Sequence, residues 1–130
     1  MTTVVEKLSA YTRGLRYENL PAEVVHQAKR LIIDTMGCAL GGYAGEPPRI
    51  ARDLAATVTS TLPATVMVSG ARTSPDLAAF ANGAAIRFLD FNDGYTSTGE
   101  SGHPSDSIAA ALAAAELSRR DGREFITAVV

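Results

Sequence analysis

The sequence has 130 residues, of which 46% are hydrophobic and 20% charged, and its net charge at pH 7 is −2. This composition is too apolar for an intrinsically disordered chain, and a near-neutral chain without a basic stripe lacks the electrostatic character of a nucleic-acid-binding protein. Because the chain has one cysteine, Cys38, and no apolar run long enough for a signal peptide or a membrane span, we expect a cytoplasmic protein of one domain without an internal disulfide.

The N-terminal part of the sequence predicts two helices. The first is short and is expected over residues 3–11. The second has the clearest helical pattern and covers residues 21–42, where Pro21 suits the first turn and Gly41 and Gly42 end the helix. At helical spacing, one face of this second helix carries the expected core residues Val24, Ala28, Leu31, Ile32, Thr35 and Ala39.

The middle of the sequence predicts a helix, a short strand and a further helix. The first of these helices begins after a pair of prolines and runs to about Val58. The β-branched run ATVMV, residues 64–68, predicts a short strand. The helix that follows is expected to have Ser74 as its N-cap and Pro75 as its first residue. Its buried stripe is expected to consist of Leu77, Ala81, Ala84 and Phe88.

The C-terminal part predicts two more helices. The alanine-rich one is expected to have Ser105 as its N-cap and to end at Gly122. Its buried side chains are expected to be those of Ile108, Leu112 and Ala115. A last helix begins at about Arg123 and is still running, apolar and without a cap, where the sequence ends. The sequence therefore predicts a mainly α fold: a helical bundle-like domain with at most a short strand pair, as part of a larger protein.

The loop LDFNDGYTSTGESGHPSD, residues 89–106, separates two alanine-rich helices and holds the residues best suited to chemistry. Asp90 follows a helix C-terminus, where the helix dipole disfavours a carboxylate, so its presence there indicates a role outside the helix. His103 precedes Pro104, which restricts the backbone of His103 to extended geometry and thereby directs its imidazole. The helix start at Ser105 offers free N–H groups that could hold a carboxylate. The loop therefore predicts proton abstraction next to a substrate carboxylate.

Structural roles also account for these residues. Asp90 and Asp93 could be solvated loop acids or caps of neighbouring N–H groups, and His103 could be a loop histidine bonded to the backbone. Asp93 and His103 could also be metal ligands, but the sequence has no third candidate nearby, and we predict no metal site. Outside the loop, His26 and Cys38 are interpreted as structural residues.

Three stretches carry a resemblance to a known family. They are LPAEVVHQAKRLIIDTMGCALGG, FANGAAIRFLDFNDGY, and GHPSD with the alanine-rich helix that follows it. With them the sequence resembles the N-terminal part of the MmgE/PrpD family, which includes 2-methylcitrate dehydratase and cis-aconitate decarboxylase. The resemblance extends from about Leu20 to the end of the chain, and the LDFND and GHPSD motifs are its specific part. The spacing between Asp90 and His103 resembles the 2-methylcitrate dehydratase branch more than the decarboxylase branch, whose loop is shorter.

The resemblance implies a mostly helical domain joined to a separate α+β lid domain, with the active site between them and a homodimer formed through the helical domains. Residues 1–130 would then be the N-terminal portion of the helical domain, without the lid. By motif match, Asp90 and His103 are expected to be catalytic, and Asp93 and Ser105 to bind substrate. The chain departs from the family at Gly94, where threonine is usual, and this leaves the exact substrate open.

The leading hypothesis is that the chain is the N-terminal part of a cofactor-independent lyase resembling 2-methylcitrate dehydratase. Such an enzyme eliminates water from a small tricarboxylate in propionate catabolism and uses no iron–sulfur cluster. In this hypothesis His103 handles a proton, and Asp90 orients it or acts as the partner acid or base. Within the family, the alternatives are decarboxylation of cis-aconitate and epimerisation of a related acid. The alternative of a different class is a non-catalytic helical module that acts through a partner.

Overall fold

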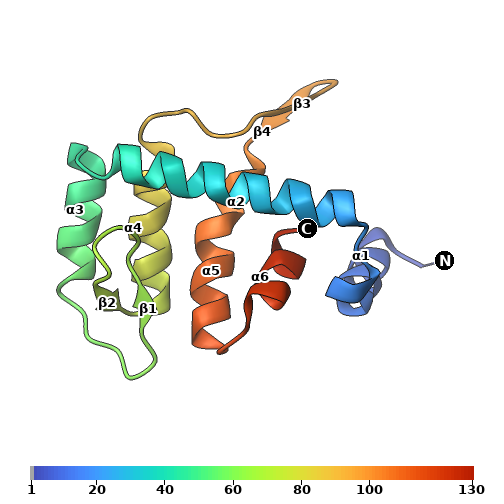
Figure 1. The fold of residues 1–130 in the computed structure, drawn as a ribbon, viewed down its shortest axis with the longest axis horizontal. Coiled ribbons are helices and arrows are strands. Elements are labelled where there is room, and N and C mark those ends of the chain that lie inside the picture. The colour runs from blue at the N-terminus through green and yellow to red at the C-terminus, as the bar shows by residue number, and fades with distance from the viewer. Residues whose placement is uncertain (1) are drawn as a thin grey trace.

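Helix α2, Ala22–Gly42, is the longest element and crosses one end of the neighbouring helices (Figure 1). The structure is a computed structural model and describes residues 2–130. The other α-helices are α1 (Val4–Gly14), α3 (Glu46–Ala55), α4 (Pro75–Arg87), α5 (Ile108–Leu117) and α6 (Gly122–Val129). Helices α3, α4 and α5 stand side by side against α2, and α4 is the central helix because it contacts the other three.

Short elements connect these helices. They are two 3₁₀ turns, η1 (Tyr17–Asn19) and η2 (Pro104–Ser107), and the strands β1 (Ala64–Thr65), β2 (Arg72–Thr73), β3 (Tyr95–Ser97) and β4 (Glu100–Gly102). The strands form two antiparallel pairs, β1 with β2 and β3 with β4. The first pair lies beside α4, whereas the β3–β4 hairpin projects from the body of the molecule on the far side of α2 (Figure 1).

The core is built mainly from alanine. One buried cluster brings together α2, α4 and α5, a second joins α3 and α4 to Val66 just after β1, and a third joins β1, α4 and α5. These clusters consist of Ala39, Ala51, Ala55, Ala64, Ala78, Ala81, Ala85, Ala109 and Ala113 with Val66 and Ile86. Small side chains let helix backbones approach closely, and Gly42 shows how closely: a Cβ at this position would overlap the backbone oxygen of Ala85 on α4. Many larger apolar side chains are left on the surface.

The structure confirms the mainly α fold. Each predicted helix is present, and Thr3 begins α1 with a capping box in which its side chain and that of Glu6 each accept a backbone N–H. Ala28, Thr35 and Ala39 of α2 are buried as predicted, and its remaining expected core residues are half-buried. Among residues 2–130 no helix is both long and apolar enough to cross a bilayer.

Several local predictions were wrong. Ser105 is not the N-cap of α5, because η2 comes first and Ser107 is the N-cap. Gly122 does not end α5 but is the first residue of α6. Phe88 is 44% exposed, because the helix α4 buries a face that is rotated from the predicted stripe. That face consists of Ala78, Ala81, Asn82, Ala85 and Ile86. The structure also has two strand pairs where at most one was expected.

Candidate active site

The loop between α4 and η2 closes on itself at its base. The β3–β4 hairpin occupies its middle, with all of its strand residues exposed. Because Tyr95 pairs with Gly102 at the open end of the hairpin, the segments on either side of it are brought together. The predicted site residues lie on these two segments, Asp90 and Asp93 before the hairpin and His103 and Ser105 after it. The hairpin therefore explains how residues ten or more positions apart become neighbours.

Asp90 lies just beyond the end of α4 in an unusual backbone conformation. Its φ is 54°, in the left-handed region that is costly for residues other than glycine. Its N–H donates to the carbonyl of Arg87 at 3.1 Å, and its carboxylate accepts from Nη2 of Arg87 at 2.9 Å. The side chain is otherwise exposed. Asp90 is thus held at the surface by a residue of the preceding turn, with one carboxylate oxygen bonded to it.

His103 is oriented by the backbone of Asp93. Its Nδ1 lies 2.7 Å from the carbonyl oxygen of Asp93, and its side chain is half-buried. A carbonyl oxygen only accepts hydrogen bonds, so we assign the proton of the neutral imidazole to Nδ1. The lone pair is then on Nε2, which is the ring atom that can take up a proton from another molecule. Extended backbone at His103, with φ −119° and ψ 101°, fits the prediction made from Pro104.

Asp93 and Ser105 bind each other. The N–H of Ser105 donates to Oδ1 of Asp93 at 3.2 Å, and the Ser105 side chain is 1% exposed. Its Oγ accepts from Nδ2 of Asn92 at 3.2 Å. The N–H that was expected to hold a substrate carboxylate therefore holds a carboxylate of the same chain. This geometry gives both residues a structural role in closing the loop.

Arg87, which the sequence analysis did not single out, is the central cation of this cluster. Its three nitrogens contact three acceptors: Oδ1 of Asp90 at 2.9 Å, Oδ1 of Asn92 at 3.0 Å and Oδ1 of Asp106 at 3.4 Å. The sequence offered one signal for this contact: Arg87 lies on the last turn of the helix, three residues before Asp90, and side chains at this spacing meet on a helix surface.

The charge of this cluster is negative. Its hydrogen bonds and ion pairs, as far as residues 2–130 show, bring together the carboxylates of Asp90, Asp93 and Asp106 with one cation, Arg87. Cys38 on α2 lies close enough to respond to it: burial raises the pKa of the Cys38 thiol, and the charges of Asp34 and Asp93 raise it further. A polyanionic substrate would need positive groups beyond those of this cluster.

The structure does not link Asp90 directly to His103. Within residues 2–130, no hydrogen bond or ion pair joins their side chains; each is held by a different partner, Arg87 or Asp93. Nor do the described residues contain a group of three or more potential metal ligands among histidine, cysteine, aspartate and glutamate. The loop carries a half-buried imidazole and an exposed carboxylate, two groups that acid–base chemistry uses.

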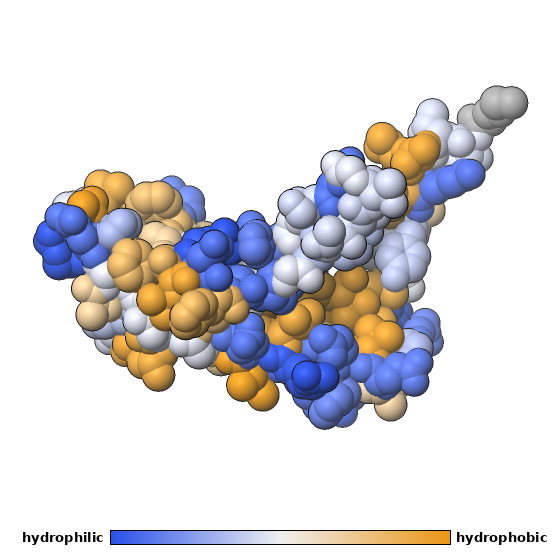
Figure 2. Space-filling model, turned by 90° about the horizontal axis from the view of Figure 1, so that it is seen from above, coloured by the Kyte–Doolittle hydropathy of each residue, from blue (hydrophilic) through white to orange (hydrophobic). Residues whose placement is uncertain are grey.

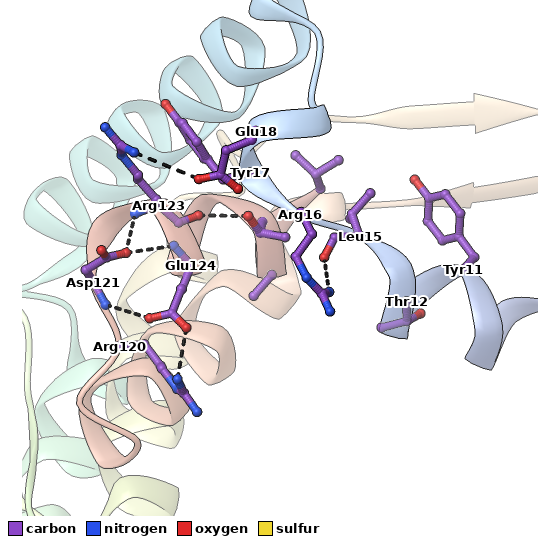
Figure 3. A pocket seen from close by; sticks show the side chains of 13 residues that line it. Tyr11, Thr12, Leu15, Arg16, Tyr17, Glu18, Arg120, Asp121, Arg123 and Glu124 are labelled. Atoms are coloured by element: carbon purple, nitrogen blue, oxygen red, sulfur yellow. Dashed lines mark hydrogen bonds and ion pairs between the residues drawn. The ribbon is translucent and has the colours of Figure 1, made fainter.

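A separate cleft lies between α1, η1 and α6 (Figure 3). Arg123 extends over the ring of Tyr17, with 5.3 Å to its centroid, and lies 3.9 Å from the carboxylate of Glu18. Arg120 pairs with Glu124 at 3.0 Å. Because these arginines are matched by acids of the same cleft, its lining offers no concentrated charge for a ligand.

Comparison with known proteins identifies the family. Residues 6–130 match the MmgE/PrpD N-terminal domain. The chain is 36% identical over 123 residues to 2-methylcitrate dehydratase of Cupriavidus necator, which covers 86% of this chain and 24% of that protein. It is 39% identical over 113 residues to 2-methylcitrate dehydratase of Escherichia coli K12, which covers 81% of this chain and 22% of that protein.

A decarboxylase is also similar to this chain. Cis-aconitate decarboxylase of Homo sapiens is 30% identical over 115 residues, which cover 88% of this chain and 23% of that protein. The chain thus spans less than a quarter of the length of these curated relatives. Since the match to the N-terminal domain of this family extends over nearly all of the sequence, residues 6–130, the chain belongs to the MmgE/PrpD family.

Proposed function

We propose that this chain is the N-terminal part of a cofactor-independent lyase that eliminates water from a small tricarboxylate of the 2-methylcitrate type. The observation that carries the proposal is the hydrogen bond between His103 Nδ1 and the Asp93 carbonyl, which leaves Nε2 available as a base. Two 2-methylcitrate dehydratases among the relatives support the substrate class.

In the proposed reaction, Nε2 of His103 takes the proton from the carbon next to a substrate carboxylate. The electrons of that C–H bond form the new double bond, and the C–O bond to the hydroxyl on the adjacent carbon breaks. An acid must protonate the leaving hydroxide to give water. Asp90 is the second acid–base group of this loop, since its carboxylate is exposed and only partly bonded by Arg87.

We further propose that a separate lid domain, outside this chain, supplies the other wall of the site. The negative charge of the cluster around Arg87 supports this, because a tricarboxylate must be bound by cations that the cluster lacks. The length of the relatives, of which this chain spans less than a quarter, leaves ample room for such a domain. The chain by itself is then inactive, since catalysis needs groups from both walls in near-attack geometry.

The cellular setting is part of the same proposal. We infer a homodimer formed through the helical domains, supported by the exposed apolar side chains of α2. The free, buried Cys38 fits a reducing compartment such as the cytoplasm. The similarity to 2-methylcitrate dehydratases supports a role in propionate catabolism.

Decarboxylation of cis-aconitate is the second candidate function. The similarity to the human decarboxylase favours it, at 30% identity over most of this chain. Both reactions need a proton to be moved at a carbon close to carboxylates, so the same histidine could serve either. Assays with 2-methylcitrate, followed by the appearance of the conjugated double bond, and with cis-aconitate, followed by the release of CO2, distinguish the two.

The test uses a protein of family length that contains this chain. Asp90→Asn keeps the shape and removes the charge, and His103→Gln keeps hydrogen bonding and removes the titrating nitrogen. Each is expected to lower kcat by about 10²- to 10⁴-fold, the usual contribution of a general acid or base. His26→Gln, an exposed position on α2, is the matched control and should leave kcat unchanged.

Melting temperatures of the same variants complete the test. They should change little, because both residues lie in a polar loop outside the alanine core. Normal kcat in both variants, or a wild-type protein that turns over neither acid, would contradict the proposed function.

A further inference from the structure

We propose that Arg87 is a positioning residue: it holds the loop in the geometry that presents Asp90 and the Nε2 atom of His103. The inference rests on the proposed function, since it assigns Arg87 a role in preparing that same site. It starts from the guanidinium group, whose three nitrogens each contact a different side chain, on Asp90, Asn92 and Asp106.

The first consequence concerns Asp90. Left-handed backbone is unfavourable for an aspartate relative to the right-handed helix, and it must be stabilised by its surroundings. The 2.9 Å contact from Nη2 of Arg87 provides a charged hydrogen bond to the carboxylate of this residue. Arg87 therefore fixes the direction in which Asp90 leaves the helix.

The second consequence reaches His103 through a continuous series of hydrogen bonds. Nη1 of Arg87 donates to Oδ1 of Asn92, and this fixes the amide so that its Nδ2 donates to Oγ of the buried Ser105. The Ser105 N–H then holds the carboxylate of Asp93, whose carbonyl receives the Nδ1 proton of His103. Each bond in this series is 2.7–3.2 Å long.

The third contact, to Asp106, joins the two ends of the loop. Asp106 belongs to η2, and its N–H donates to the carbonyl of His103 at 3.0 Å. Arg87 thus bridges the end of α4 and the turn that carries His103, with 3.4 Å between Nε and Oδ1 of Asp106. Lysine could not replace it, since a single ammonium cannot reach three acceptors in the fixed fork of a guanidinium.

These contacts also argue against a direct role in holding the substrate. Nη1 and Nη2 each donate one hydrogen bond within the chain and Nε pairs with Asp106, so a substrate carboxylate would have to compete with Asp90, Asn92 and Asp106 for the guanidinium. Positioning and substrate binding predict different kinetics, because a positioning residue affects kcat and a uniform binding contact affects KM.

The first measurement is the tautomer of His103 in this chain, observed by ¹⁵N NMR of the ring nitrogens at a pH where the imidazole is neutral. The chain has two histidines, so His26→Gln assigns the signals. The wild type should show the Nδ1–H tautomer. Arg87→Lys and Asn92→Ala should both shift His103 toward the Nε2–H tautomer, whereas Arg49→Gln, which breaks an exposed ion pair with Asp53 on α3, should not.

Asn92→Ala keeps the test decisive where an Arg87 variant fails to fold, because it interrupts the same series one residue further on. An unchanged tautomer in Asn92→Ala and in folded Arg87→Lys overturns the proposal. So does a shift of equal size in Arg49→Gln. This readout needs no turnover, so it stands or falls separately from the proposed function.

The second measurement is kinetic and uses the family-length protein. Arg87→Lys should lower kcat by about 10²-fold, the cost of a small misplacement of the reacting groups, and leave KM nearly unchanged. A raised KM with normal kcat would instead make Arg87 a substrate-binding residue and overturn the positioning role. If the wild-type protein itself shows no turnover, the proposed function is contradicted, and the NMR result alone decides the role of Arg87.

Discussion

A single buried amide, that of Asn82, ties helix α4 to the irregular segment after β1. Asn82 is 2% exposed; its Oδ1 accepts from the N–H of Met67 at 2.7 Å and its Nδ2 donates to the carbonyl of Thr65 at 2.9 Å. Short strands leave such backbone groups without ladder partners, and buried groups of this kind must be satisfied. The side chain of Asn82 thus takes the place of a neighbouring strand.

Replacement of Asn82 by alanine should therefore destabilise the domain strongly. It leaves one donor and one acceptor of the backbone without partners, and we expect a loss of about 2–4 kcal/mol in the free energy of unfolding. Urea denaturation followed by circular dichroism measures it. Asn19→Ala in the exposed η1 turn is the control and should stay within about 0.5 kcal/mol. A similar small effect at Asn82 would show that water replaces its two bonds.

At the residue scale, the sequence indicated which side chains could take part in chemistry, but it did not indicate which residues they bond to. It singled out Asp90, His103, Asp93 and Ser105 from their types and motifs, but the hydrogen bonds among them depend on a hairpin that brings the two loop segments together. Arg87 was overlooked for the same reason, since two of its acceptors are fixed only by the folded loop. Their roles in catalysis stay predictions.

At the scale of elements, the contact between α2 and α4 sets how tightly the domain packs. A Cβ at Gly42 would overlap the backbone oxygen of Ala85 and approach Phe88, whereas one at Gly37, on the same helix, would meet nothing within 4 Å. Both glycines belong to α2, Gly37 in its interior and Gly42 as its last residue, and they differ in their tertiary surroundings. Substitutions at the two positions therefore separate the free-energy cost of glycine within a helix from the stabilisation that comes from the close approach of α2 and α4.

Gly42→Ala should destabilise the domain, and Gly37→Ala should stabilise it. Forcing α2 and α4 apart costs about 1–3 kcal/mol, as overpacking of a tight core does. At the open position, alanine gains about 0.4–1 kcal/mol because it restricts the unfolded chain. Thermal unfolding of the two variants beside the wild type tests both signs. Equal shifts in the same direction would mean that the α2–α4 contact is looser than described.

Helices were predictable here because their caps and apolar spacing lie within a few residues. The β3–β4 hairpin was missed because its strand residues are all exposed and so lack an apolar alternation to indicate a strand. Ser105 was assigned as a cap because the sequence PSDS fits a helix start, and only the structure shows that η2 precedes α5. The rotated face of α4 has the same origin: an alanine-rich helix carries too weak an apolar contrast to indicate which side is buried.

At the scale of the whole molecule, the large apolar side chains lie mostly on the surface, whereas the core consists mainly of alanine. Figure 2 shows hydrophobic side chains spread over the face seen there, between hydrophilic ones. On α2, the buried residues Ala28, Thr35 and Ala39 occupy one side, and another, exposed side carries a second apolar stripe. We call this the outer stripe of α2; it consists of Ile33, Met36 and Leu40, which are 70%, 47% and 65% exposed.

We expect this chain to self-associate through the outer stripe of α2. Helices that are apolar on two sides bury both, and large exposed apolar patches mark association sites. Light scattering at high micromolar concentration should give a mass near twice the 13.6 kDa of the chain. Replacing Ile33 and Leu40 together by serine should restore the monomer, because it removes the apolar area that drives the contact.

The matched control replaces Val4 and Leu8, which are exposed on α1, by serine in the same way. Since α1 buries none of its residues, it has no fixed surface against the body of the molecule, and we expect this variant to stay associated. A monomeric wild type, or association lost in the α1 variant and kept in the α2 variant, would contradict the prediction. In the second case the contact between copies runs through α1, and the outer stripe of α2 is free for another part of a longer protein.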